Sequence, residues 1–250
     1  MKVREKVAVI TGASRGLGRE LALAFAREGA YGLVLVARGA AELRETARRV
    51  REIAPDAKVV DVVADVADAA DVERAAATAL AAFPEGIDVL VNNASALGPS
   101  PMPYLLDYPA DAFREVLATN VVGPFLLIKQ LLGAMVERGG SIVNVTSEAG
   151  RVGYPGWGAY GISKFALEGL SQTWAAVLEG SGVRVNWVDP GNMDTEMHRL
   201  AEPDEDPSEW ADPASVVDVF LYLASDASAG VTGRRFEAQE DWRAVAGGAS

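Results

Sequence analysis

Short apolar runs alternate with longer segments of helical periodicity along most of the chain. The runs are rich in valine, leucine and isoleucine, which is typical of strands buried on both faces of a sheet. Strands are predicted at residues 7–10, 33–37, 58–63, 89–91, 142–145, 183–188 and 235–237, and helices at 17–27, 40–53, 70–82, 110–137 and 158–179. This alternation predicts an α/β fold, a doubly wound parallel sheet of about seven strands with helices on both faces.

The chain is predicted to form a single domain over residues 1–250, because no internal repeat and no linker rich in glycine, serine or proline divides it. One compositional break lies at residues 202–213, where acidic residues mix with three prolines. It belongs to an excursion over residues 192–213 that we expect to act as a mobile substrate lid. Residues 244–250 are expected to form a frayed tail.

Composition excludes several classes of function. The chain has no cysteine and a single histidine, His198, so disulfides, thiol catalysis and multi-histidine metal sites are excluded and no metal is expected. His198 is interpreted as a loop residue. The formal net charge of −12 opposes nonspecific binding to nucleic acid, so no nucleic-acid partner is expected.

Apolar runs are short compared with a membrane span. Residues 121–128 form one of the longest, far below the roughly 20 residues that cross a bilayer, so no membrane association is expected. The basic start of the chain is followed by only four apolar residues, Val7 to Ile10, too few for the apolar region of a signal peptide. The expected location is the cytoplasm.

A glycine-rich turn follows the first predicted strand and opens the first predicted helix. It reads Thr11-Gly-Ala-Ser-Arg-Gly-Leu-Gly18. Gly12 suits a tight turn, Gly16 allows close approach of a pyrophosphate, and Gly18 allows close packing of helix on strand. Free N–H groups at the start of the helix would face that anion. Glycine turns between strand and helix are frequent, so it is the position at the head of a parallel sheet that favours dinucleotide binding.

Two arginines indicate which dinucleotide is bound. In many NAD-binding chains an acidic residue at the end of the second strand contacts the ribose 2′-hydroxyl. Here that strand ends at Ala37 and Arg38 follows. Arg38 and Arg15 could together bind a 2′-phosphate, which favours NADP(H) over NAD(H). The alternative is a pair of solvated surface arginines.

Tyr160 and Lys164 stand four residues apart, on one face of the helix predicted at 158–179. A phenolate mostly formed at pH 7 needs a fall in pKa of roughly 3 units, about 4 kcal/mol. An ammonium at ~4 Å supplies on the order of 4 kcal/mol at an effective dielectric constant of 20. We therefore expect Lys164 to lower the pKa of Tyr160, although burial of the phenol would oppose that shift.

With these motifs in order, the chain resembles the short-chain dehydrogenase/reductase family over roughly residues 5–195. The resemblance implies a Rossmann-like fold and a catalytic set of Asn120, Ser147, Tyr160 and Lys164. It implies cofactor contacts from Gly12, Ser14, Arg15, Gly16, Leu17, Gly18, Arg38, Asp65, Val66, Asn93, Ala94, Tyr160, Lys164, Pro190, Gly191 and Thr195. The chain departs from the family pattern at Ser95, where glycine is usual, and after Gly233, where the closing Asp-Gly-Gly is missing.

The resemblance implies an oxidoreductase that transfers a hydride between NADP(H) and a carbonyl compound or secondary alcohol. Tyr160 would be the general acid/base, Lys164 would also anchor the nicotinamide ribose, Ser147 would bind the substrate oxygen, and Asn120 would hold a water. One alternative is a non-catalytic NADP-binding regulator or scaffold of the same fold. Another is an epimerase or dehydratase of the longer relatives, which carry an additional substrate domain.

The substrate is expected to be a small carbonyl compound or alcohol. A partly apolar or aromatic one is suggested by Tyr154, Trp157, Met193 and Met197, residues that could equally pack a lid. The acidic segment would disfavour anionic substrates if it closes over the site. The resemblance also implies a homo-tetramer or homo-dimer, in keeping with the extra apolar residues of helix 158–179.

Overall fold

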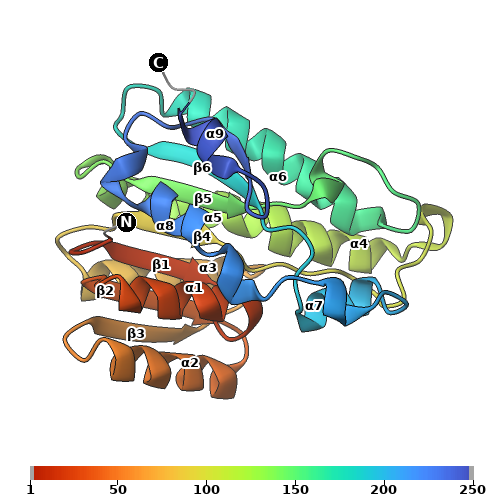
Figure 1. Cartoon of the computed structure of the whole chain (residues 1–250), viewed down its shortest axis with the longest axis horizontal. Coiled ribbons are helices and arrows are strands. Elements are labelled where there is room, and N and C mark those ends of the chain that lie inside the picture. Colours follow the sequence, from red (N-terminus) through yellow and green to blue (C-terminus); the bar gives the residue numbers. More distant parts are fainter. Residues whose placement is uncertain (1–2, 248–250) are drawn as a thin grey trace.

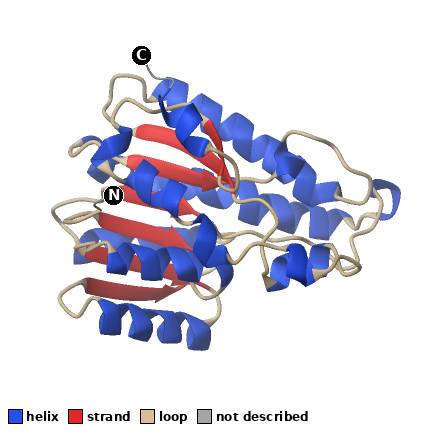
Figure 2. Ribbon diagram, viewed as in Figure 1, coloured by secondary structure: helices blue, strands red, loops and turns tan. Residues whose placement is uncertain are grey.

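The computed structural model describes residues 3–247 and has a seven-stranded sheet at its centre. Neighbouring strands pair in parallel, in the order β3-β2-β1-β4-β5-β6-β7, and the arrows in Figure 2 accordingly point the same way. The strands are β1 (Val7–Thr11), β2 (Gly32–Ala37), β3 (Lys58–Val63), β4 (Val89–Asn92), β5 (Ser141–Val145), β6 (Arg184–Asp189) and β7 (Arg235–Glu237). The predicted doubly wound sheet is confirmed.

Helices cover both faces of the sheet (Figure 1). One face packs against α1 (Gly16–Arg27), α2 (Ala40–Ile53), α8 (Asp218–Ala224) and α9 (Trp242–Gly247), and the other against α3 (Ala69–Ala82), α5 (Gly123–Val136) and α6 (Gly158–Val177). Helix α4 (Ala110–Leu117) packs beside α6, and α7 (Glu196–Ala201) lies beyond the carboxyl ends of the strands. Short 3-10 turns occur at Leu105–Asp107, Glu148–Gly150, Pro207–Glu209, Pro213–Val216 and Asp226–Ser228.

The helix predicted over 110–137 is interrupted where the candidate residue Asn120 stands. A π-helical segment, Ala118–Val122, separates α4 from α5. Pro124 explains the break, because it has no N–H to donate to the carbonyl of Asn120 four residues earlier. By length and composition the run Ala110–Val136 could cross a membrane, but it packs as a partly buried core helix with Leu127 and Leu131 inside.

Three helices near the C-terminus, α7, α8 and α9, were not predicted, and His198, expected in a loop, lies in α7. In α8, Val219, Phe220 and Leu223 are buried against the sheet. Residues 244–247 of the expected tail belong to α9, which is held by contacts of Trp242 and Val245. The Trp242 ring lies 5.2 Å from that of Tyr222, and the Arg234 guanidinium donates to the Val245 carbonyl at 3.0 Å. The rest of the predicted tail lies outside the described residues.

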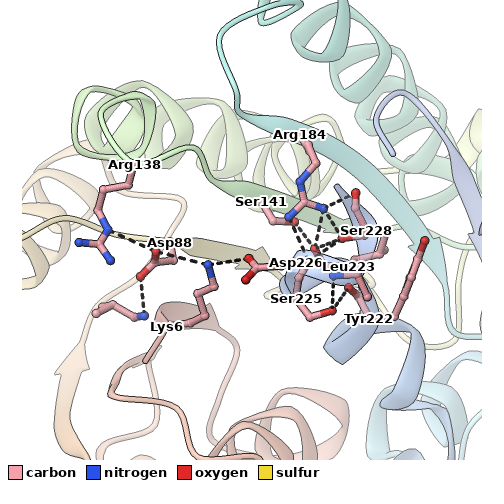
Figure 3. A network of polar contacts seen from close by, with 12 residues as sticks. Lys6, Asp88, Arg138, Ser141, Arg184, Tyr222, Leu223, Ser225, Asp226 and Ser228 are labelled. Carbon is pink, nitrogen blue, oxygen red and sulfur yellow. Dashed lines mark hydrogen bonds and ion pairs between the residues drawn. The ribbon is translucent and has the colours of Figure 1, made fainter. Parts of the chain in front are cut away.

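A polar network ties together the amino ends of the strands, the edge opposite the glycine turn (Figure 3). Buried Asp88, just before β4, accepts from the Val7 backbone N–H at 2.8 Å and from Arg138 at 3.3 Å. The Lys6 ammonium lies between Asp88 and Asp226 (Figure 3). Nearby, Arg184 at the start of β6 donates to the carbonyls of Leu223, Ser225 and Ser228. These contacts hold the amino ends of the strands together, and none of them involves the carboxyl ends, where the glycine turn lies.

Candidate active site

Two cavities meet at the carboxyl edge of the sheet. The first, the glycine-turn cleft, has a volume of about 590 Å³ and runs from the turn after β1 to α6. The second cavity, of about 530 Å³, lies between the segment after β5, the segment after β6 and β7. Both are lined by Thr146, Tyr160, Pro190, Met193, Thr195 and Met197. A molecule in either cavity would therefore reach the Tyr160 phenol.

The glycine turn has no room for larger residues. Gly12 adopts φ of +67°, and a Cβ there would lie 2.7 Å from the side-chain nitrogen of Asn93. A Cβ on Gly18 would lie 2.2 Å from the Gly12 carbonyl oxygen, whereas Gly16 adopts φ of +52° and faces the cleft. The three predicted roles, a tight turn, a close approach and close helix packing, each have a physical basis here.

Asn93 fastens the end of β4 to this turn. Its side-chain nitrogen donates to the Thr11 carbonyl at 2.9 Å, and the backbone N–H groups of Asn93 and Ala94 donate to the Thr11 hydroxyl at 3.0 Å. The turn and the start of the next segment thus form one rigid wall of the cleft. Through these bonds Asn93 holds the segment after β4 against the glycine turn.

The cleft carries cationic groups that already have carboxylate partners. Arg15 forms an ion pair with Glu196 of α7, and Arg38 lies 3.7 Å from Asp65. Both guanidinium groups are more than half exposed and line the cleft near the end of β2. Two forked cations beside the N-terminus of α1 are donors that fit the phosphates of a dinucleotide.

Tyr160 and Lys164 lie on one buried face of α6. The Lys164 ammonium donates to the Val145 carbonyl at 2.9 Å and lies 5.3 Å from the centre of the Tyr160 ring. Burial raises the pKa of Tyr160 to about 12, with a hydrogen bond to Ser147 opposing this and the charge of Asp189 adding to it. Burial lowers the pKa of Lys164 to about 8, against the charges of Asp189 and Glu168. The pKa of Tyr160 is therefore raised and not lowered as expected, because desolvation of the buried phenol is the largest effect on it.

Ser147 follows β5 by two residues. Its backbone is extended, and it caps the turn Glu148–Gly150. Its hydroxyl accepts from the Ala149 N–H at 3.3 Å and bonds with Tyr160. Its carbonyl accepts from the Gly150 N–H at 2.9 Å and from Arg235 at 3.1 Å. The hydroxyls of Ser147 and Tyr160 therefore lie side by side in the lining of the second cavity, where one substrate oxygen could bind both.

Asn120 is buried behind the cleft with its side chain fully engaged. Its oxygen accepts from the Ala96 N–H at 2.7 Å and from the Ser95 hydroxyl at 3.2 Å. Its nitrogen donates to the Ala96 carbonyl at 2.9 Å and to the Ser163 hydroxyl at 2.8 Å. The side chain therefore ties the segment after β4 to α6. A water at Asn120, as predicted, would have to be held by another group of this residue.

The second cavity has chemically different walls. Leu97, Trp157 and Met197 form an apolar side beside Tyr160. The lining also includes Glu148, Glu209, Glu237 and Glu240, and Arg151, which donates to Glu237 at 3.1 Å. The predicted apolar character thus describes one wall only.

Most of the predicted cofactor residues are brought together. The glycine-turn cleft is lined by Gly12, Ser14, Arg15, Gly16, Leu17, Arg38, Asp65, Val66, Asn93, Ala94, Tyr160, Lys164, Pro190 and Thr195. Gly18 packs behind the turn, and Gly191 faces the second cavity. The sequence argument missed Glu42, Thr119 and Arg199, which also line the cleft. They stand inside helical segments whose periodicity carries no signal of a cleft.

The chain is similar to known proteins over most of its length. The pattern of the short chain dehydrogenase family matches residues 6–206. An uncharacterized oxidoreductase of Escherichia coli, YciK, is 33% identical over 95% of this chain and 93% of its own. The 2-(R)-hydroxypropyl-CoM dehydrogenase of Xanthobacter autotrophicus is 38% identical over 91% of this chain and 94% of its own. A short chain dehydrogenase of Shigella flexneri, solved in complex with NADP, superimposes with a TM-score of 0.87 at 31% identity, covering 95% and 98% of the two chains.

Proposed function

The chain belongs to the short-chain dehydrogenase/reductase family, and on that premise we propose that it reduces a carbonyl compound, or oxidises a secondary alcohol, with NADP(H) in preference to NAD(H). As a member of this family, the protein is an oxidoreductase that acts on hydroxyl or carbonyl groups with an NAD(P) cofactor.

The observation that carries the proposal is the position of Tyr160, whose side chain lines both cavities. A dinucleotide in the glycine-turn cleft and a substrate in the second cavity would both end at this phenol. The neighbouring Ser147 hydroxyl and Lys164 ammonium complete a group that can bind an oxygen and move a proton to or from it.

NADP(H) would be held by the residues that line the glycine-turn cleft. The N-terminus of α1 suits the pyrophosphate, and Arg15 with Arg38 suits the 2′-phosphate. When bound, the cofactor supplies the hydride for reduction or accepts it during oxidation. The NADP bound to the Shigella flexneri relative supports this choice.

Tyr160 donates its proton to the substrate oxygen during reduction and takes one back during oxidation. With a pKa of about 12 the phenol is protonated at neutral pH, which is the form that reduction requires. Ser147 holds the same oxygen, and Lys164 keeps a positive charge beside the phenol below its own pKa of about 8. Asn120 acts indirectly, by fixing the segment after β4 against α6.

Residues 192–213 are proposed as the substrate lid. The base of the segment is closed by a bridge between Met193 and Ala211, and its helix α7 is tied to the loop after β4 by a bond from the Ser100 hydroxyl to the Leu200 carbonyl at 2.9 Å. The carboxylates of the second cavity support a neutral or cationic substrate over an anionic one.

The proposal is tested by consumption of NADPH with a panel of ketones, sugars and steroids. Tyr160→Phe should lower kcat/KM by about 10²–10⁴-fold, since general acid catalysis is lost, while NADPH affinity stays within a few fold. Tyr31→Phe, on the exposed surface at the far side of the sheet, should leave both unchanged. Undiminished turnover by Tyr160→Phe would remove the assigned role of the phenol.

A regulator of the same fold is separated from an enzyme by the same assay. Binding of NADPH with no change of redox state for any carbonyl compound or alcohol of the panel would favour the regulator. The intact group of Tyr160, Lys164 and Ser147 supports the enzyme, because a protein that only binds the cofactor has no need of a proton donor beside it.

A cytoplasmic homo-tetramer, or a homo-dimer, is proposed for the assembly. Exposed apolar residues gather along α5 and α6, and the rings of Phe125 and Trp174 lie 6.4 Å apart between those helices. The group comprises Val122, Phe125, Ile162, Phe165 and Val177. Light scattering on the purified protein tests the assembly, and Phe165→Glu should shift it toward the monomer.

A further inference from the structure

Arg235 of β7 is the centre of a buried cluster of charged groups beneath the candidate active site. Its Nε donates to Glu168 at 2.9 Å and its Nη2 donates to Asp189 at 2.9 Å. The same Nη2 donates to the backbone carbonyl of Ser147 at 3.1 Å. The Arg235 side chain is 13% exposed, and the two carboxylates are less than 10% exposed. One guanidinium therefore joins α6, the end of β6 and the residue that carries the serine hydroxyl.

Glu168 extends the functional face of α6 by one turn. Residues 160, 164 and 168 are spaced by four, so Tyr160, Lys164 and Glu168 share one side of the helix. The Glu168 carboxylate also accepts from the Thr146 hydroxyl at 2.8 Å and from the Trp187 indole at 3.1 Å. It thereby connects the helix of the phenol to β5 and β6.

Three consecutive residues, the last of β5 and the two that follow it, are each held by a side chain of this cluster. Lys164 binds the Val145 carbonyl, Glu168 binds the Thr146 hydroxyl, and Arg235 binds the Ser147 carbonyl. The position of the Ser147 hydroxyl depends on this short segment. Arg235 belongs to β7, the last strand of the sheet, so β7 helps to fix the position of Ser147 through this bond.

The buried charges of the cluster balance. Lys164 and Arg235 are cations, and Glu168 and Asp189 are anions. The more exposed Glu237 forms ion pairs with both Arg235 and the exposed Arg151, so this second pair of charges also balances. Loss of the Arg235 charge would leave two carboxylates facing Lys164 alone. A carboxylate near a lysine favours the ammonium form, so the balance sets the protonation of Lys164.

We propose that Arg235 is a positioning residue of the active site, which fixes Ser147 through its carbonyl and neutralises Glu168 and Asp189 beneath Tyr160 and Lys164. The proposal rests on the proposed function for its kinetic consequence. Its electrostatic consequence concerns Lys164 and can be measured without any turnover.

Arg184 provides a matched control, because it is also a well-bonded arginine of the sheet but lies at the opposite edge (Figure 3). Both Arg235→Gln and Arg184→Gln should lower the stability of the fold. Only the first should act on the candidate site. A role of Arg235 confined to fastening β7 would make the two variants behave alike.

The experiment follows the titration of Lys164 by NMR of protein labelled with ¹³C at lysine Cε. The chain has five lysines, and comparison with Lys164→Met identifies the signal. Arg235→Gln should raise the titration midpoint of Lys164 by about one pH unit and lower kcat/KM for reduction about 10–100-fold. The double variant Glu168→Gln/Arg235→Gln should return the midpoint toward that of the wild type, since charge balance is restored.

Arg235→Lys separates the two effects and serves if Arg235→Gln does not fold. It retains the charge and loses the fork, so the Lys164 midpoint should stay near that of the wild type while kcat/KM falls. An unchanged midpoint in Arg235→Gln, full activity in Arg235→Lys, or equal shifts in Arg184→Gln would each overturn the proposal. A wild type that turns over no substrate would remove the proposed function, whereas the Lys164 titration would still decide the role of Arg235.

Discussion

At the scale of single residues, burial of the Lys164 ammonium beside Tyr160 should lower the stability of the fold. Burial lowers its pKa to about 8, whereas an unfolded lysine keeps its proton up to about pH 10.5. Between these values the unfolded chain binds more protons, so stability rises with pH, and below about pH 8 the full cost, about 3 kcal/mol, is present. We predict that Lys164→Met raises the free energy of unfolding at pH 7 by ~1–3 kcal/mol while activity is lost.

Urea unfolding at pH 7 and near pH 10 measures this difference. The gain of Lys164→Met should shrink at the higher pH, because the wild-type lysine is then neutral in the folded state. Lys129→Met, at an exposed position of α5, should change stability by less than about 0.5 kcal/mol at both pH values. A Lys164→Met protein that is less stable than the wild type at pH 7 would contradict the prediction.

The proposed preference for NADP(H) can be tested at Arg38, also at the scale of single residues. Its guanidinium lies at the mouth of the glycine-turn cleft, 3.7 Å from Asp65. In Arg38→Asp a second carboxylate would meet the 2′-phosphate, so the KM for NADPH should rise about tenfold or more while that for NADH changes little. Steady-state kinetics with both cofactors checks this, with Arg44→Asp on an exposed turn of α2 as the control. Equal changes for the two cofactors would refute the assignment.

At the scale of elements, apolar runs predicted the central strands β1, β2, β4 and β5, because strands buried on both faces are continuously apolar. The two outer strands β3 and β7 were also predicted, although they are only partly buried. Hydrophobic periodicity failed where a single residue changes the backbone, as Pro124 does in the π-helical segment. It also missed α8, a helix of seven residues that is too short to show a clear helical period. For the site, spacing found Tyr160 and Lys164, but burial, which sets their pKa values, has no signal in spacing.

Gly32 at the start of β2 shows how tightly these elements pack. A Cβ there would lie 2.2 Å from the ring of Phe83, which is fully buried. Gly32→Ala should therefore lower stability by about 1–3 kcal/mol through overpacking. Gly133→Ala in α5 is the matched control, since a Cβ at that position meets no described atom within 4 Å. It should raise stability by about 0.5–1 kcal/mol, and thermal unfolding of both variants distinguishes the two directions.

At the scale of the whole molecule, the carboxyl ends and the amino ends of the strands differ in what surrounds them. The carboxyl ends of the strands meet the two cavities, as expected for ligands of open α/β sheets. The amino ends carry the network of Asp88 and Arg184 (Figure 3). Charged groups are buried at both edges, yet only those at the carboxyl edge lie next to Tyr160. Stability and activity should therefore respond independently to changes at the two edges.

Asp88 allows this separation to be tested. It is 4% exposed and accepts bonds from the Val7 N–H and Arg138, so Asp88→Ala leaves buried donors unpaired and should cost about 2–4 kcal/mol of stability. Asp226→Ala removes the other partner of Lys6, but its carboxylate is 88% exposed, so the loss should stay below about 0.5 kcal/mol. Below the unfolding temperature both variants should keep the kcat/KM of the wild type. A fall in kcat/KM of Asp88→Ala, measured on folded protein, would show that the two edges are coupled.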